Sequence, residues 1–67
     1  MEKGTVKMYD KNCGMGVISR AFAADVQFYS QSIVGRGRAH ITQGDSVWFE
    51  INDIKNLHIA INVLKCN

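Results

Sequence analysis

The sequence predicts a small all-β domain, a barrel of five short antiparallel strands. Short runs of alternating apolar and polar residues recur along the chain, turn-forming residues separate them, and no helical period is sustained for three turns. The 67 residues contain no proline and show no internal repeat. A chain of this length forms one domain, residues 1–67, with a thin core and marginal stability.

Each strand is bounded by residues that favour turns or close backbone approach. The expected strands are residues 3–9, 15–20, 25–30, 46–52 and 58–64. Asp10-Lys11-Asn12 is rich in turn formers and ends the first strand. Gly14 and Gly16 let another backbone or a ligand approach the second strand closely. Residues 31–44 form a long connection with a single helical turn near 31–33, and residues 53–57 join the last two strands.

The inward-facing residues of these strands supply the expected core. Strand alternation gives the set Val6, Ile18, Val26, Phe28, Ile33, Ile41, Val47, Phe49, Ile51, Ile59, Ile61 and Val63. By the same alternation Trp48 points outward. Trp48 with Leu64 is therefore a candidate interaction patch, because a lone exposed tryptophan is a frequent interface anchor. The alternative is that Trp48 lies along a neighbouring strand or under the long connection.

Composition and residue spacing argue against several other classes of protein. The six carboxylates and two histidines show no pairing suited to general acid–base catalysis, so no enzyme is expected. The two cysteines, Cys13 and Cys66, match no zinc spacing with the histidines, so we expect no metal, no cofactor and free thiols. No apolar run could span a bilayer, and no apolar signal segment precedes the first strand. We therefore expect a soluble cytoplasmic protein. A net charge of +2 permits nucleic acid as a partner without requiring it.

Four segments of the chain resemble the bacterial cold-shock domain. Residues 13–18 read Cys-Gly-Met-Gly-Val-Ile and residues 25–30 read Asp-Val-Gln-Phe-Tyr-Ser, where the family has Lys-Gly-Phe-Gly-Phe-Ile and Val-Phe-Val-His-Phe. Residues 3–7, Lys-Gly-Thr-Val-Lys, precede these motifs, and residues 44–51, Gly-Asp-Ser-Val-Trp-Phe-Glu-Ile, follow them. The resemblance spans residues 2–65 without gaps. It implies an OB-fold barrel that binds single-stranded RNA or DNA and opens structured transcripts.

The resemblance places a nucleic-acid-binding face on the first three strands. Its candidate residues are Lys7, Met8, Tyr9, Lys11, Met15, Val17, Gln27, Tyr29 and Arg38. Most of the family's aromatic rings are replaced: Met8 stands at a tryptophan position, and Met15, Val17 and Gln27 at phenylalanine positions. Since each base stacked on a ring is worth about 1–3 kcal/mol, the face predicts weakened or altered binding.

Three interpretations of this face remain open. In the first, the protein binds single strands weakly, as an RNA chaperone or a regulator of gene expression. In the second, Met8, Met15 and Val17 form a protein-contact surface of a module that binds a protein partner or forms a homodimer, helped by a strand edge left by an incompletely closed barrel. In the third, these apolar residues are ordinary exposed side chains.

Overall fold

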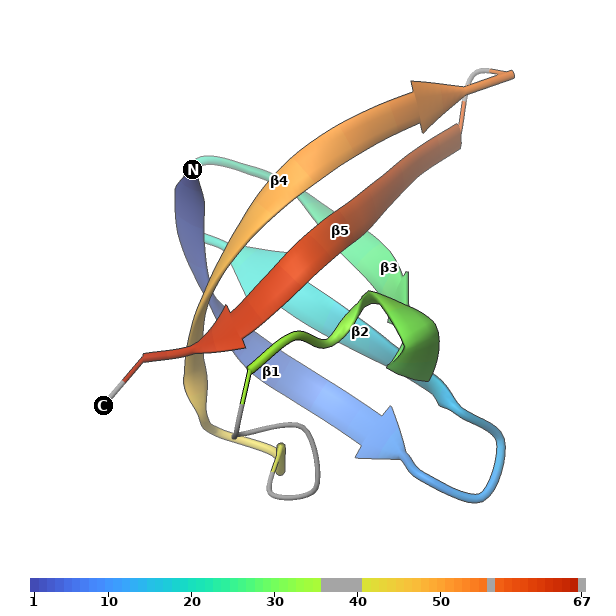
Figure 1. The fold of residues 1–67 in the computed structure, drawn as a ribbon. Coiled ribbons are helices and arrows are strands. Elements are labelled where there is room, and N and C mark those ends of the chain that lie inside the picture. Colours follow the sequence, from blue (N-terminus) through green and yellow to red (C-terminus); the bar gives the residue numbers. More distant parts are fainter. Residues whose placement is uncertain (36–40, 56, 67) are drawn as a thin grey trace.

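The computed structural model describes residues 1–35, 41–55 and 57–66, and its five strands form a closed barrel (Figure 1). The elements are β1 (Glu2–Asp10), β2 (Met15–Arg20), β3 (Ala23–Tyr29), the 3₁₀ turn η1 (Ser30–Ser32), β4 (Ser46–Ile54) and β5 (Leu57–Lys65). Each expected strand overlaps one of these five. The all-β class and the five-stranded barrel are thereby confirmed. Within the described residues, no helix is long and apolar enough to cross a membrane.

The barrel closes through two joins that connect distant parts of the sequence. The strand order is β1-β2-β3-β5-β4, and β4 returns to β1 through four antiparallel pairs from Glu2↔Phe49 to Thr5↔Ser46. β3 meets β5 in parallel at Gln27↔Ile59 and Phe28↔Ala60. The expectation of an incompletely closed barrel is therefore wrong. The far ends of β4 and β5 extend past the barrel as a hairpin (Figure 1).

The core contains most of the expected residues. Ile51, also expected inside, is half-buried and packs against the core, and β5 brings a further correction. The buried members of the core are Val6, Ile18, Val26, Phe28, Ile33, Ile41, Val47, Phe49, Ala60 and Val63. Ile59 and Ile61, which strict alternation placed inside, are only half-buried, and Ala60 takes the inward position between them. The reason is an irregularity between the pairs Trp48↔Leu64 and Glu50↔Ile61, where β5 carries one extra residue. Asn62 lies there at φ 52°.

The turn between β1 and β2 is built around the Asp10 carboxylate. Its Oδ1 accepts a hydrogen bond from the Asn12 N–H at 2.9 Å, and its Oδ2 accepts one from the Cys13 thiol at 3.2 Å. Gly14 follows at φ 72°, a conformation that a residue with a Cβ rarely adopts. The Cys13 hydrogen bond to Asp10 and the charge of that carboxylate raise the pKa of the Cys13 thiol. The turn therefore disfavours a reactive thiolate at Cys13.

The core assignment predicts that Phe49→Ala costs about 3–5 kcal/mol, because it empties the space of a completely buried ring. That loss is comparable to the whole stability of a small domain, so the variant should be largely unfolded. Urea unfolding followed by circular dichroism measures the loss. Ile61→Ala, at a half-buried position, is the control and should cost clearly less. Equal losses for the two variants would contradict the burial described above.

The Asp10–Cys13 hydrogen bond predicts slow alkylation of Cys13 near pH 8. Asp10→Asn removes the negative charge while keeping an oxygen that can accept the Asn12 N–H, so the pKa of Cys13 should fall and its thiolate fraction should rise. Iodoacetamide labelling with site-resolved mass spectrometry measures the rate. Cys66 in the same sample is the control and should be unchanged. An unchanged Cys13 rate in the variant would contradict the role of Asp10.

Candidate nucleic-acid interface

A bulge in β1 decides which candidate side chains face outward. Val6 pairs with Ile18, but Met8 pairs with Val17, so β1 carries one extra residue, Lys7, at this point. Val6 and Ile18 are buried, whereas Met8 is exposed. The extra residue reverses the alternation, and Met8 therefore joins the outer surface while Tyr9 turns toward the interior.

The outward residues of β1, β2 and β3 form one face in register. Met8, Val17 and Gln27 occupy successive strands as directly paired residues, and Met15 pairs with Tyr29 one step further along. These five side chains are called the β1–β3 face below. The most exposed large apolar groups on it are Met8, 44% exposed, and the Tyr29 ring, 36% exposed. The structure thus brings five of the nine candidate binding residues together.

Tyr9 is placed differently from the other candidates. Its ring stacks on the buried ring of Phe28, with 5.5 Å between centroids and 16° between the planes. Gly16 lies between these two residues in the strand pairing, and a Cβ on Gly16 would come within 2.4 Å of the Phe28 ring. Gly16 therefore serves internal packing, rather than the approach of a ligand.

A shallow hollow adjoins the β1–β3 face at the end of β1. It is lined by Tyr9, Asp10 and Lys11 on one side and by residues 41–43 on the other. Lys11 is exposed, and no carboxylate among the described residues lies within ion-pair distance of it. The two candidates Tyr9 and Lys11 thus share this hollow.

The charge of Lys7 is largely neutralised where it stands. Its Nζ lies 3.0 Å from Oδ2 of Asp25 on β3, and both side chains are exposed. Such an exposed pair is worth at most about 1 kcal/mol, so a phosphate can compete for Lys7. The net charge of the Lys7–Asp25 pair is nevertheless zero. The pair therefore adds little to the long-range attraction of an anionic strand.

The two residues of the candidate interaction patch are direct neighbours. Trp48 on β4 pairs with Leu64 on β5, and their side chains are 38% and 39% exposed. Lys3 pairs with Trp48 on the other side, and its Nζ lies 5.5 Å from the centroid of the Trp48 ring. The prediction that Trp48 points outward is thereby confirmed. The patch lies on β4 and β5, outside the β1–β3 face.

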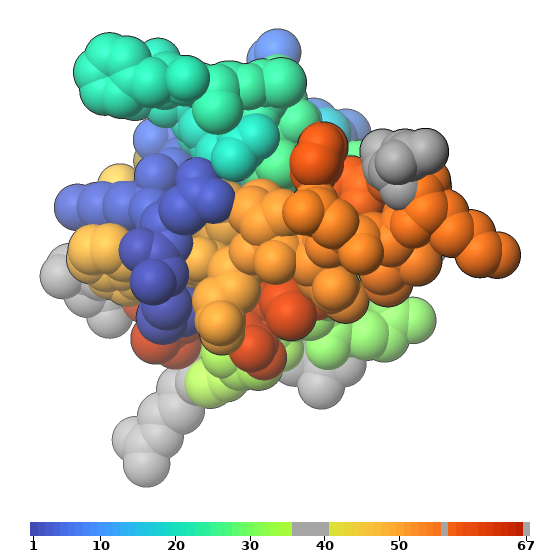
Figure 2. Space-filling model, turned by 90° about the horizontal axis from the view of Figure 1, so that it is seen from above, coloured from blue at the N-terminus to red at the C-terminus, as the bar shows by residue number. Residues whose placement is uncertain are grey.

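Sequence reasoning did not identify every residue at these surfaces. Ile59 continues the outer row beyond Gln27 through the β3–β5 pairing, and only the unforeseen bulge at Asn62 puts it there. Phe22 is fully exposed in the turn between β2 and β3, which projects from the body of the molecule (Figure 2). A phenylalanine flanked by alanines between two strands was the available signal. Arg38, the remaining candidate, lies outside the described residues.

The β1–β3 face offers one exposed ring, two thioethers, a valine and an amide. Thioethers and aliphatic groups can contact a base by dispersion, and the Gln27 amide can donate and accept hydrogen bonds at a base edge. The side chains here include no paired acids or bases suited to catalysis. The face can therefore contribute dispersion contacts and amide hydrogen bonds to a bound molecule.

Two comparisons with known proteins agree with this geometry. The family model described as the 'Cold-shock' DNA-binding domain matches residues 2–66. The Cold shock-like protein CspC of Buchnera aphidicola subsp. Acyrthosiphon pisum (strain APS) is 37% identical over 62 residues, which cover 91% of this chain and 90% of that protein. The match extends over the whole barrel, including all strands of the β1–β3 face. The chain belongs to the cold-shock domain family of nucleic-acid-binding proteins.

Proposed function

We propose that the protein binds single-stranded RNA or DNA on the β1–β3 face, more weakly than a ring-rich cold-shock domain does. In this role it acts as an RNA chaperone or as a regulator of gene expression. The observation that carries the proposal is the register of the face: Met8, Val17 and Gln27 lie in one row, with the exposed Tyr29 ring beside them. We expect the ligand to be a nucleic acid because the matching family model is that of the 'Cold-shock' DNA-binding domain.

Unpaired bases fit this face better than a duplex does. A single strand can lay its bases flat against Tyr29 and the neighbouring methionines, whereas the bases of a duplex are stacked on one another. Stacking on rings tolerates any base, and the amide of Gln27 adds only a modest preference. We therefore expect broad recognition of single strands.

Weakness follows from the side chains that replace the rings. A base stacked on an aromatic side chain is worth about 1–3 kcal/mol, and two lost contacts change Kd by roughly 30- to 2 × 10⁴-fold. The paired Lys7 adds little charge, and within residues 1–35, 41–55 and 57–66 this leaves Lys11 as the exposed cation beside the face. Weak binding gives rapid release, which suits a protein that opens a transient RNA structure and then dissociates.

The proposal predicts that restoring rings strengthens binding. The triple variant Met8→Trp, Met15→Phe, Gln27→Phe should bind a pyrimidine-rich strand at least about tenfold more tightly than the parent protein. The parent should bind the same strand detectably at low salt, with a salt slope of only about 0.7 for each phosphate contact. Fluorescence anisotropy of a labelled oligonucleotide measures both quantities.

Leu64→Trp is the matched control, because it adds a ring at an exposed position of the interaction patch, which lies on β4 and β5 outside the β1–β3 face. It should leave the affinity unchanged. No gain from the triple variant would mean that the geometry of the face differs from that of its ring-rich relatives. Absence of binding by both the parent and the triple variant would contradict the proposed function.

A second candidate function is association through the interaction patch, either with another copy of the chain or with a protein partner. It is supported by the direct pairing of Trp48 with Leu64 and by Val34, another exposed apolar residue, whose N–H donates to the carbonyl of Val63 at 2.8 Å. Together these place three large apolar side chains in one region of the surface.

This second candidate predicts a concentration-dependent mass in solution. Analytical ultracentrifugation should show a dimer at high concentration, and Trp48→Ala should shift the equilibrium toward the monomer while the melting temperature changes little. Met15→Lys is the control, since Met15 belongs to the β1–β3 face and not to the patch. A monomer at every accessible concentration would exclude self-association. Equal shifts of the monomer–dimer equilibrium in Trp48→Ala and Met15→Lys would show that the interaction patch does not mediate the association.

A further inference from the structure

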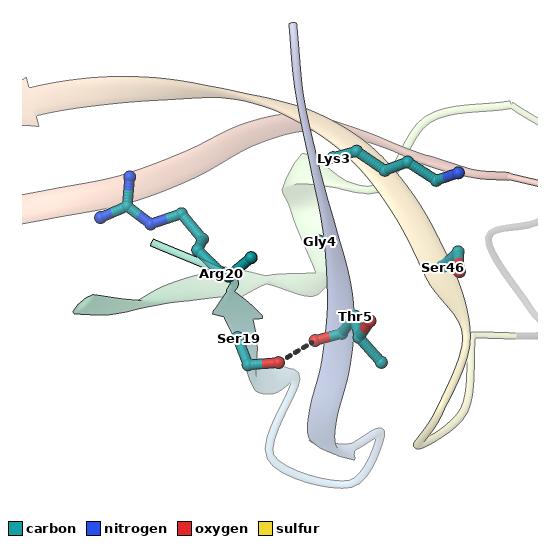
Figure 3. A pocket seen from close by; sticks show the side chains of 7 residues that line it. Lys3, Gly4, Thr5, Ser19, Arg20 and Ser46 are labelled. Atoms are coloured by element: carbon teal, nitrogen blue, oxygen red, sulfur yellow. Dashed lines mark hydrogen bonds between the residues drawn. The ribbon is translucent and has the colours of Figure 1, made fainter. Parts of the chain in front are cut away.

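An open groove crosses β2, β1 and β4 beyond the end of the β1–β3 face. Its centre is a row of three hydroxyl side chains, since Thr5 on β1 pairs with Ser19 on β2 and with Ser46 on β4. The lining also includes Lys3, Gly4, Arg20 and Ala21, and the volume of the groove is about 330 Å³. Figure 3 shows the labelled side chains along an arc from Arg20 through Ser19, Thr5 and Ser46 to Lys3.

Two of the three hydroxyls are available to a ligand. The Ser19 hydroxyl donates to the main-chain carbonyl of Thr5 at 3.3 Å, drawn as a dashed line in Figure 3. The hydroxyls of Thr5 and Ser46 have no hydrogen-bond partner among the described residues. Each can donate one hydrogen bond and accept others. The floor of the groove therefore presents unused donors on two adjacent strands.

Cationic groups lie at both ends of this row. Lys3 has no carboxylate partner among the described residues, and its Nζ lies over the Trp48 ring. Arg20 is fixed by its Nε, which donates to the carbonyl of Ala24 at 2.7 Å, and by its Nη1, 3.2 Å from Oε1 of Glu2. Those contacts use two of its five N–H donors.

The nearby acids do not leave the groove negative. Glu2 faces Arg20, and the Asp45 carboxylate lies 3.5 Å from Nζ of Lys65 and accepts the Thr42 N–H at 2.9 Å. Lys3 therefore remains as the charge in excess. One positive charge with two hydroxyl donors suits a phosphate group, whose oxygens accept hydrogen bonds, better than it suits a cation or an apolar group.

The groove is continuous with the β1–β3 face. Ser19 is the next outward residue after Val17 on β2, two residues or about 7 Å away. Thr5 precedes Met8 on the outward side of β1, with the bulge between them. A strand whose bases contact Met8 and Val17 can thus extend along β1 and β2 into the groove without leaving the surface.

We propose that this groove is a phosphate subsite, in which Thr5, Ser46 and Lys3 hold the sugar–phosphate backbone of a single strand bound on the β1–β3 face. The inference rests on the proposed function and adds a second part to the interface. It assigns no base recognition to the groove, because none of the lining residues carries an aromatic ring. The groove lengthens the bound strand and strengthens binding independently of sequence.

Oligothymidylates of about four and about eight nucleotides separate the two parts of the interface, since OB folds cover about 4–16 nucleotides. The double variant Thr5→Val, Ser46→Ala should bind the longer strand roughly three- to tenfold more weakly than the parent and the shorter strand equally well. Lys3→Gln should reduce the salt slope for the longer strand by about 0.7. Lys55→Gln removes the same charge on the β4–β5 hairpin and should leave the slope unchanged.

Amide shifts of Thr5 and Ser46 identify the source of the phosphate. The longer strand should move them, and inorganic phosphate at the same phosphate concentration should not; equal shifts with inorganic phosphate would overturn the assignment to a strand. If the shorter strand binds and the groove variants have no effect on the longer one, the groove proposal fails alone. If the shorter strand does not bind while the longer one moves Thr5 and Ser46, the proposed function of the β1–β3 face fails alone. Absence of binding by both strands would overturn both proposals.

Discussion

The packing of Phe28 against Tyr9 across Gly16 is the constraint on which the rest of the barrel depends. The three residues lie on adjacent strands in one inward row, and the Phe28 ring occupies the space that a side chain at position 16 would need. This packing fixes β1, β2 and β3 in register. Because alternate residues of a strand face opposite sides, the same register sets the outward row Met8, Val17 and Gln27. The core and the candidate binding face are thus two consequences of one arrangement.

Two bulges then adjust which side chains reach the surface. The extra residue Lys7 in β1 turns Met8 outward and Tyr9 inward, so that a ring available by sequence becomes part of the internal packing. The irregularity at Asn62 in β5 turns Ile59 outward beside Gln27. The result is a face with one exposed ring and several flexible or aliphatic groups. The barrel is that of the cold-shock domain family, whereas the face carries few of the aromatic rings expected from that resemblance.

The strands, the five-stranded barrel and most of the core follow from the sequence because alternation and turn residues are local signals. Val26, Phe28, Val47 and Phe49 are buried as alternation requires. The expected inward positions of Ile59 and Ile61 were wrong, because the bulge that shifts them arises where β5 pairs with β4. The sequence of β5 alone gives little sign of that bulge. The pairing of Lys7 with Asp25 and the row Ser19–Thr5–Ser46 depend on contacts between separate strands. Such contacts carry no sequence signal in a single chain.

We propose that the bases of a bound single strand lie against Met8, Met15 and Val17 on the β1–β3 face. The most direct measurement is a set of intermolecular nuclear Overhauser effects between a single-stranded oligonucleotide and the methyl groups of the protein. We expect contacts from base protons to the methyl groups of Met8 and Met15 and to the Val17 methyls. Contacts confined to the methyls of Leu64 and the ring of Trp48, with none on the β1–β3 face, would contradict it.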